Sequence, residues 1–147
     1  MKKIIVPLFV LMVILCSCTT SKSVVSNSAD LSKYQYAALS DVMDYSGPPT
    51  MMDIEVHIYN ALEQTRLQII GERSIHKLTD EQQERLLLVK YSAYQDEKEA
   101  IVSANFTDYN TGKPVASCRG TYALGIDYEG DLKGAIKQLA NEFRKLF

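Results

Sequence analysis

The residues in this sequence that could do chemistry are two histidines, three cysteines and one serine in a tight turn. His57 and His76 have no cysteine or third histidine at metal-ligand spacing, so the sequence predicts no metal site. Cys118 would act as a nucleophile only if a histidine approached it, and its position in an alternating apolar segment favours a buried thiol. Ser46 lies in YSGPP, which lacks the G-x-S-x-G pattern of a nucleophilic serine. These residues indicate neither catalysis nor a cofactor.

The acidic run at residues 96–99, DEKE, could in principle supply oxygen ligands to calcium. Four consecutive residues lack the alternating spacing of a calcium loop, so the solvated end of a hairpin is the favoured interpretation. The chain also has nine tyrosines and no tryptophan. These tyrosines are the available amphipathic contact residues, although half or more of them are expected to be structural.

An apolar run at residues 4–15 follows Lys2 and Lys3 at the start of the sequence. A positive segment followed by an uncharged run of this length is typical of a signal peptide. As a helix the run would extend about 18 Å, well short of the ~30 Å hydrocarbon core of a bilayer. The run is therefore predicted to direct export rather than to span a membrane.

Two cysteines, Cys16 and Cys18, follow this run and offer two cleavage positions. Cleavage before Cys18 places the small residue Ser17 at the cut, whereas cleavage before Cys16 would place the bulky Leu15 there. The stretch LCSCTT resembles the lipobox of bacterial lipoproteins. This resemblance implies a signal peptide at 1–17, a thioether-linked diacylglycerol on Cys18 and an acyl group such as palmitate on its new amino terminus. The alternative is an ordinary secretory signal that contains cysteines.

Anchoring and charge together define the expected partners and location. Several acyl chains hold a protein on a membrane essentially permanently. The lipoprotein resemblance implies that Thr19, in place of an aspartate after Cys18, directs the protein to the Gram-negative outer membrane, facing the periplasm or the cell surface. Loss of Lys2 and Lys3 with the leader leaves 14 basic and 18 acidic residues, a net charge of −4. An acidic chain without a basic aromatic cluster is not expected to bind nucleic acid.

The rest of the chain is predicted to be a short linker and one domain. Residues 18–29 are predicted to form a flexible tether, because they are rich in hydroxyl groups and have no aromatic residue or apolar period. Residues 30–147 are predicted to form a single globular domain, because no second linker or internal repeat interrupts them. Cys118 would be the one unmodified thiol in the mature chain, so an apolar core rather than a disulfide must stabilise this domain.

Apolar periodicity predicts two helices and about five strands. One helix is expected to begin near Thr50 and to stop at Gly71, because its apolar positions recur at three and four residues. A last helix is expected after Asp131, which can cap its first turn. Alternation at period two indicates strands, one of which opens with a continuous apolar run. The expected strands cover residues 33–39, 71–76, 86–94, 100–107 and 116–124.

The element order β-α-β-β-β-β-α predicts an α+β two-layer sandwich. A strand-helix-strand crossover makes the first two strands parallel, and the later three strands should form an antiparallel meander. The result is a mixed sheet of about five strands with two helices on one face. In this arrangement the loop at residues 40–49 and the turn at residues 109–113 are expected to leave the sheet at the same end.

A helix ending ALEQTRLQIIG and a turn DYNTGKPVA, in this order of elements, resemble the small Gram-negative envelope lipoproteins of unknown function over residues 31–147. More distantly, they resemble the globular domains of curli-assembly and penicillin-binding-protein-activator lipoproteins. The resemblance implies a binding or scaffolding module with an envelope protein or the cell wall as its partner. This chain departs from those families because it has no tryptophan and no long disordered arm, so no specific partner is implied.

The favoured hypothesis is a lipid-anchored, non-catalytic binding or assembly module of the envelope. Tyr45 and Tyr109 are the predicted partner-binding residues, because aromatic side chains on loops are enriched at binding hot spots. The opposing interpretation is that both tyrosines only pack over their own turns. The alternative function is a small envelope enzyme or enzyme inhibitor whose site is assembled from residues distant in sequence.

Overall fold

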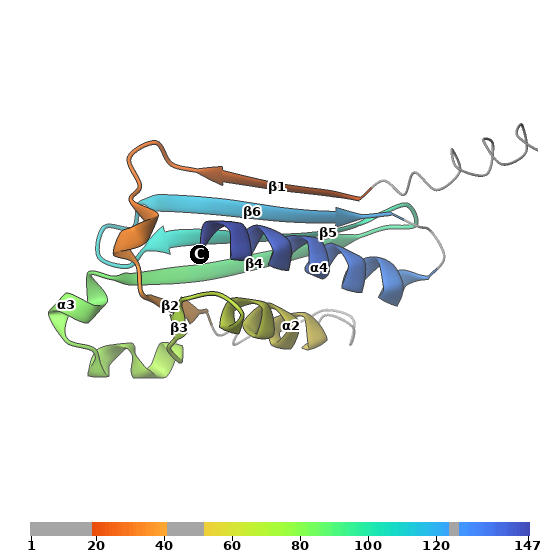
Figure 1. Cartoon of the computed structure of the whole chain (residues 1–147). Coiled ribbons are helices and arrows are strands. Elements are labelled where there is room, and N and C mark those ends of the chain that lie inside the picture. Colours follow the sequence, from red (N-terminus) through yellow and green to blue (C-terminus); the bar gives the residue numbers. More distant parts are fainter. Residues whose placement is uncertain (1–18, 41–51, 124–126) are drawn as a thin grey trace, which may run out of the picture.

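The chain folds into two layers, a six-stranded mixed sheet and a pair of long helices (Figure 1). The computed structural model describes residues 19–40, 52–123 and 127–147. The strands are β1 (Thr20–Val25), β2 (Tyr36–Leu39), β3 (Gln68–Ile69), β4 (Leu86–Gln95), β5 (Ala100–Asp108) and β6 (Pro114–Tyr122). The α-helices are α2 (Met52–Glu63), α3 (Asp80–Gln83) and α4 (Tyr128–Leu146), and the 3-10 helices are η1 (Leu31–Lys33) and η3 (Glu72–Lys77).

The sheet has the strand order β1-β6-β5-β4-β2-β3. β2 pairs in parallel with both β3 and β4, whereas β4, β5, β6 and β1 form successive antiparallel pairs. The predicted α+β sandwich, with its parallel crossover and antiparallel meander, is confirmed. The second strand lies at Gln68–Ile69 rather than at residues 71–76, where η3 forms instead.

The two long helices α2 and α4 lie side by side on one face of the sheet, as the sequence predicts. The apolar stripe of α4 packs on β6 and β5 because its buried residues recur at three and four positions. Thr79 caps the short helix α3 in a capping box with Gln82. Within residues 19–40, 52–123 and 127–147, no helix is both long enough and apolar enough to cross a membrane.

The prediction of a flexible tether at residues 18–29 is wrong for Thr20–Val25, which form the edge strand β1. β1 pairs with β6 over its whole length. Its inward hydroxyls face the buried carboxylate of Glu142 on α4, where Ser21 Oγ donates to Oε1 at 2.7 Å. Burial raises the pKa of Glu142, but hydrogen bonds from Lys145, Ser23 and Ser21 outweigh this effect and lower it. β1 lacks an apolar period because two of its inward side chains, Ser21 and Ser23, donate hydrogen bonds to the carboxylate of Glu142.

The core lies between the sheet and the two long helices. Phe106 of β5 and Phe143 of α4 are fully buried and pack edge to face, with ring centroids 5.3 Å apart. A smaller apolar cluster occupies the other face of the sheet, where Ile75 of η3 packs with Ala38 and Leu86. The short strand β2 is therefore covered on both faces, which explains its continuous apolar sequence.

The two layers approach each other very closely at Gly120 of β6. A Cβ atom at this position would lie 2.1 Å from the carbonyl oxygen of Ala135 and 2.5 Å from the backbone nitrogen of Leu139. Because both atoms belong to the backbone of α4, we expect Gly120→Ala to lower the free energy of unfolding by about 1–3 kcal/mol. Gly71→Ala is the matched control, since Gly71 has a φ of −64° and a Cβ added there would have no neighbouring atom within 4 Å. Urea unfolding measures both variants, and equal stabilities would contradict this contact.

The prediction that residues 40–49 and the turn at 109–113 leave the same end of the sheet is wrong. β2 and β4 are parallel, and both begin at the end of the sheet where β5 finishes. The turn after β5 therefore lies where β2 starts, whereas residues 40–49 follow Leu39, the last residue of β2. The prediction failed because it treated the strand at 86–94 as antiparallel to the first strand.

Candidate functional site

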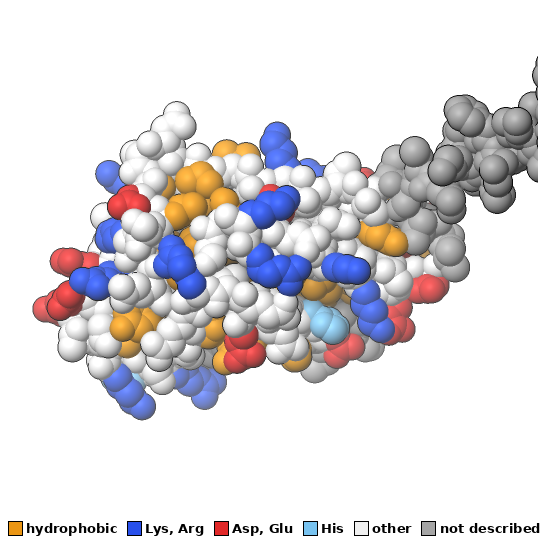
Figure 2. Space-filling view, viewed as in Figure 1, with side chains coloured by type: hydrophobic (Ala, Val, Ile, Leu, Met, Phe, Trp, Pro, Cys, Tyr) orange, Lys and Arg blue, Asp and Glu red, His pale blue; other side chains and the backbone are white. Residues whose placement is uncertain are grey.

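A groove of about 440 Å³ runs between α2 and α4 on the helix face of the molecule. Its floor is apolar and consists of Ala61, Ile136 and Ala140, all buried. Two of these three residues are alanines, whose small side chains leave space between the helices. Figure 2 shows Lys and Arg side chains along this face, next to a histidine. The polar walls are formed on one side by His57 and Asn60 of α2 and by Gln64, which directly follows α2. On the other side they are formed by Lys133, Lys137 and Arg144 of α4.

The three cations of the groove differ in their partners. Arg144 is held in position by two amides, because it donates to Gln64 Oε1 at 2.7 Å and to Asn141 Oδ1 at 2.5 Å. Lys133 donates to Glu129 at 2.5 Å, and this hydrogen bond raises the pKa of Lys133. Lys137 makes no hydrogen bond or ion pair with any residue that the structure describes. In the groove, the charge of Lys133 is therefore neutralised by Glu129, whereas Lys137 and Arg144 can each contact an anion.

The groove can bind a ligand that combines an anionic group with an apolar part. Lys137 and Arg144 are seven residues apart, which is about 10 Å along the helix, so each can contact a separate carboxylate or phosphate group. Arg144 lies in the last turns of α4, where a cation also complements the helix dipole. The dipole does not account for Lys137, which lies in the middle of the helix. Lys137 is therefore the groove cation that is most available to contact an anion from outside the chain.

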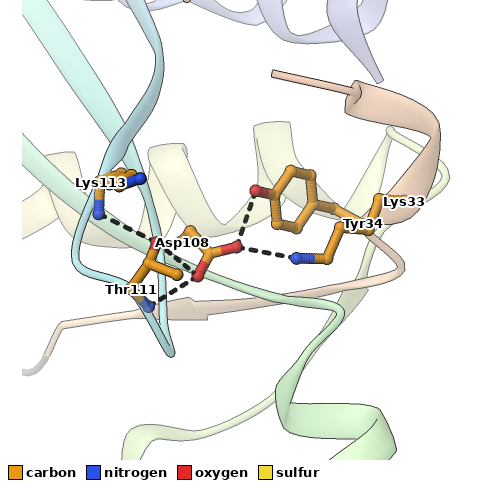
Figure 3. Close-up of polar contacts among 5 residues, drawn as sticks. All are labelled: Lys33, Tyr34, Asp108, Thr111 and Lys113. Atoms are coloured by element: carbon orange, nitrogen blue, oxygen red, sulfur yellow. Dashed lines mark hydrogen bonds and ion pairs between the residues drawn. The ribbon is translucent and has the colours of Figure 1, made fainter. Parts of the chain in front are cut away.

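A second polar cluster surrounds the buried carboxylate of Asp108 at the end of β5 (Figure 3). One oxygen accepts from Lys33 Nζ at 3.1 Å and from the Tyr34 hydroxyl at 2.9 Å. The other accepts from the backbone N–H and the hydroxyl of Thr111, at 2.8 and 2.9 Å. Burial raises the pKa of Asp108, but these hydrogen bonds outweigh it and hold the pKa well below its ordinary value. Because both oxygens are satisfied, the cluster joins η1 to the β5–β6 turn and is structural.

Cys118, His76 and Asp96 form no site with the other residues that the structure describes. Cys118 is fully buried on β6, and burial, together with the carboxylate of Glu142, raises the pKa of its thiol to about 12. Such a thiol is protonated at neutral pH and is a poor nucleophile. His76 is exposed, and Asp96 accepts hydrogen bonds from two backbone N–H groups in its own hairpin turn. Among the described residues, no group of three or more His, Cys, Asp or Glu is placed to hold a metal ion.

The residues predicted for lipid attachment and partner binding have different outcomes. Cys18 and Tyr45 lie outside the described residues. Tyr109 is half-buried against the smaller apolar cluster, and its N–H donates to the carbonyl oxygen of Leu86 at 3.1 Å. This position agrees with the interpretation that Tyr109 packs over its own turn, and a role in partner binding stays a prediction.

Sequence reasoning missed the groove. The signal on α4 was a row of cations, Lys133, Lys137 and Arg144, beside the predicted apolar stripe. On α2 the amide-bearing wall residues looked like an ordinary solvated helix face. The site becomes visible only when the fold places these two helices next to each other, and no local pattern in the sequence specifies that pairing.

Comparison with known proteins shows a shared fold. No protein-family model and no curated protein sequence matches this chain. Among solved structures, the PelC dodecamer from Paraburkholderia phytofirmans is 13% identical, with a TM-score of 0.58 over 88% of this chain and 97% of that chain. A substituted variant of the same dodecamer is 12% identical, with a TM-score of 0.59 over 86% of this chain and 98% of that chain. A PDZ domain protein from Parabacteroides distasonis is 12% identical, with a TM-score of 0.53 over 82% of this chain and 34% of that chain.

Proposed function

We propose that this chain is a lipid-anchored lipoprotein of the Gram-negative envelope whose domain binds a partner without catalysing a reaction. Cys18 is the proposed lipid attachment site, and the outer membrane, facing the periplasm or the cell surface, is the proposed location. The observation that carries the binding function is the groove between α2 and α4, where Lys137, without a partner among the described residues, lies beside an apolar floor. The proposed ligand is an envelope component with an anionic group and an apolar part.

The position of β1 supports direct anchoring of the domain. β1 begins at Thr20, two residues after Cys18, and two residues extend at most about 7 Å. The strand is fixed by its pairing with β6 and by the hydrogen bond from Ser21 to Glu142. A lipid on Cys18 would therefore hold one end of the sheet close to the bilayer surface, without an intervening tether.

The buried ionisable groups support a non-catalytic role. Asp108 and Glu142 both accept hydrogen bonds within the fold, and the hydrogen bonds hold both carboxyl pKa values below their ordinary range. General acid–base catalysis near neutral pH requires groups whose pKa lies close to that of the medium. The alternative, a small envelope enzyme or enzyme inhibitor, would need a reactive group in the groove, and His57 is the available candidate there.

The partner of this domain could include further copies of the same chain, because two of the similar structures are PelC dodecamers. β1 lies at the edge of the sheet, so its outer backbone groups are placed to pair with another strand. The molar mass of the detergent-solubilised protein, measured by light scattering, distinguishes self-association from a monomer that binds other molecules.

Site-specific photocrosslinking in the native envelope tests the binding function. A photoreactive residue in place of Asn60 lies in the groove wall, whereas one in place of Val56 lies on the same helix, 58% exposed and outside the groove. We expect capture of a discrete partner at position 60 only. The double variant Lys137→Glu, Arg144→Glu should reduce this capture at least about tenfold, because a hydrogen bond to a charged group contributes about 1.5–3 kcal/mol.

Lys98→Glu is the control for net charge, because Lys98 is an exposed cation at the β4–β5 hairpin, away from the groove. Its capture yield should equal that of the unmodified protein. Equal capture at positions 56 and 60, or capture that the double variant leaves unchanged, would place the binding site elsewhere. Membrane anchoring is measured separately through Cys18, so failure of one part of the proposal does not imply failure of the other.

A further inference from the structure

The face of the sheet opposite α2 and α4 is formed by the outward side chains of β1, β6, β5 and β4, which we name the open face. Side chains along a strand point alternately to the two faces of the sheet. The residues on either side of each core residue therefore point away from α2 and α4. Lys22, Lys90 and Arg119 are exposed there. The open face comprises Thr20, Lys22, Val24, Ser117, Arg119, Thr121, Ile101, Ser103, Asn105, Thr107, Lys90, Ser92 and Tyr94.

Every charged side chain of the open face is a cation. Lys22 of β1 lies directly opposite Arg119 of β6 in the strand register. Like charges at opposed positions destabilise a sheet, and neither side chain has an ion-pair partner among the described residues. Lys90 lies on β4, three strands from β1, or about 14 Å across the sheet. A chain with a formal net charge of −2 thus places three cations on one face of its sheet.

The groups between these cations are hydroxyls and an amide. Ser103 lies opposite Arg119 on one side and Ser92 on the other, and Asn105 lies opposite both Ser117 and Lys90. Next to them is a shallow cavity of about 310 Å³ with Val24 and Pro114 among its lining residues. Such a surface offers donors and acceptors for hydroxyl groups and a small apolar area for C–H groups.

We propose that the open face binds an acidic polysaccharide, with carboxylates at the cations and sugar hydroxyls at the serine and asparagine side chains. A single small anion cannot contact cations about 14 Å apart, whereas an extended chain can cross several strands. A protein interface would require an apolar or aromatic centre, and a nucleic acid single strand would require a platform of stacked aromatics. The described open face has one aromatic residue, Tyr94, at its rim. This site is on the opposite side of the sheet from the groove and does not depend on it.

Affinity electrophoresis of the full chain in detergent tests the inference, with polygalacturonate in the gel as the anionic probe and dextran as the neutral one. We expect retardation by polygalacturonate alone, and this retardation should weaken as salt is raised. The variant Lys22→Glu, Arg119→Glu should weaken binding at least about tenfold, through loss of two charge-assisted contacts and gain of repulsion. Lys22→Gln with Arg119→Gln, which removes charge without reversing it, should weaken binding less but still measurably.

The control for net charge is Lys77→Glu with Lys98→Glu, which changes the charge by the same amount at two exposed positions outside both the open face and the groove. It should bind polygalacturonate as the unmodified chain does. Equal losses in the two glutamate variants would overturn the inference, because binding would then reflect net charge. Equal binding of polyglutamate, stronger binding of phosphatidylglycerol vesicles through the same residues, or no retardation by polygalacturonate would also overturn it. Unchanged circular dichroism of the glutamine variant establishes that any loss is local.

Discussion

Cys18→Ser is expected to abolish palmitate labelling and to move the protein from the membrane fraction to the soluble fraction, or to leave it with an uncleaved leader. Serine cannot form the thioether to which a diacylglycerol is attached, and a single acyl chain or none binds a membrane only marginally. Radiolabelled palmitate and carbonate extraction of membranes measure the two outcomes.

Cys16→Ser is the matched control, because it removes the neighbouring thiol and keeps the proposed cleavage position. This variant should still incorporate palmitate and remain in the membrane fraction. Loss of label in the Cys16 variant, with label retained in the Cys18 variant, would reverse the assignment. Density-gradient separation of the two envelope membranes then tests the location, since Thr19 predicts that the protein sediments with outer-membrane vesicles.

Elements with their own apolar period could be predicted from the sequence. The strands β4, β5 and β6 and the helix α4 bury alternate or helically spaced side chains against one core, so each carries its pattern in its own residues. β1 could not be predicted in this way. Its inward residues Ser21 and Ser23 are complementary to Glu142, a partner more than one hundred residues away in the chain.

The two candidate binding surfaces depend on the same long-range information. The groove requires α2 to lie beside α4, and the open face requires β1 to lie beside β6. The sequence places Lys22 in a predicted linker. Its position opposite Arg119 follows only from the pairing of β1 with β6. In both surfaces the sequence contains the cations, but only the pairing of distant elements shows which of them share one surface.

Asp108 should contribute more to stability than the exposed Asp96, because four hydrogen bonds from three residues meet at its buried side chain. We expect Asp108→Asn to lower the free energy of unfolding by about 3 kcal/mol or more, since it turns an amide toward donors such as Tyr34 and removes the charge that pairs with Lys33. Asp96→Asn is the matched control at an exposed hairpin turn and should cost about 1 kcal/mol or less. Urea unfolding at pH 7 measures both variants, and a similar loss in the two would contradict a structural role for the cluster.

The contribution of the charge on Asp108 can be tested by comparing the unmodified protein with Asp108→Asn at several pH values. Its pKa in the folded protein is held below the ordinary value of 3.8, so its ionised form is stabilised by folding. That contribution is complete above the unfolded-state pKa and is lost as the pH falls below it toward the folded-state pKa. The difference in unfolding free energy between the unmodified protein and Asp108→Asn should therefore be constant from about pH 7 to pH 5 and should shrink between about pH 4 and pH 2. Hydrogen bonds also lower the pKa of Glu142, but Glu142 is present in both proteins, so its contribution cancels in the difference. A difference that did not change below pH 4 would mean that Asp108 stabilises the fold through its shape and hydrogen bonds rather than through its charge.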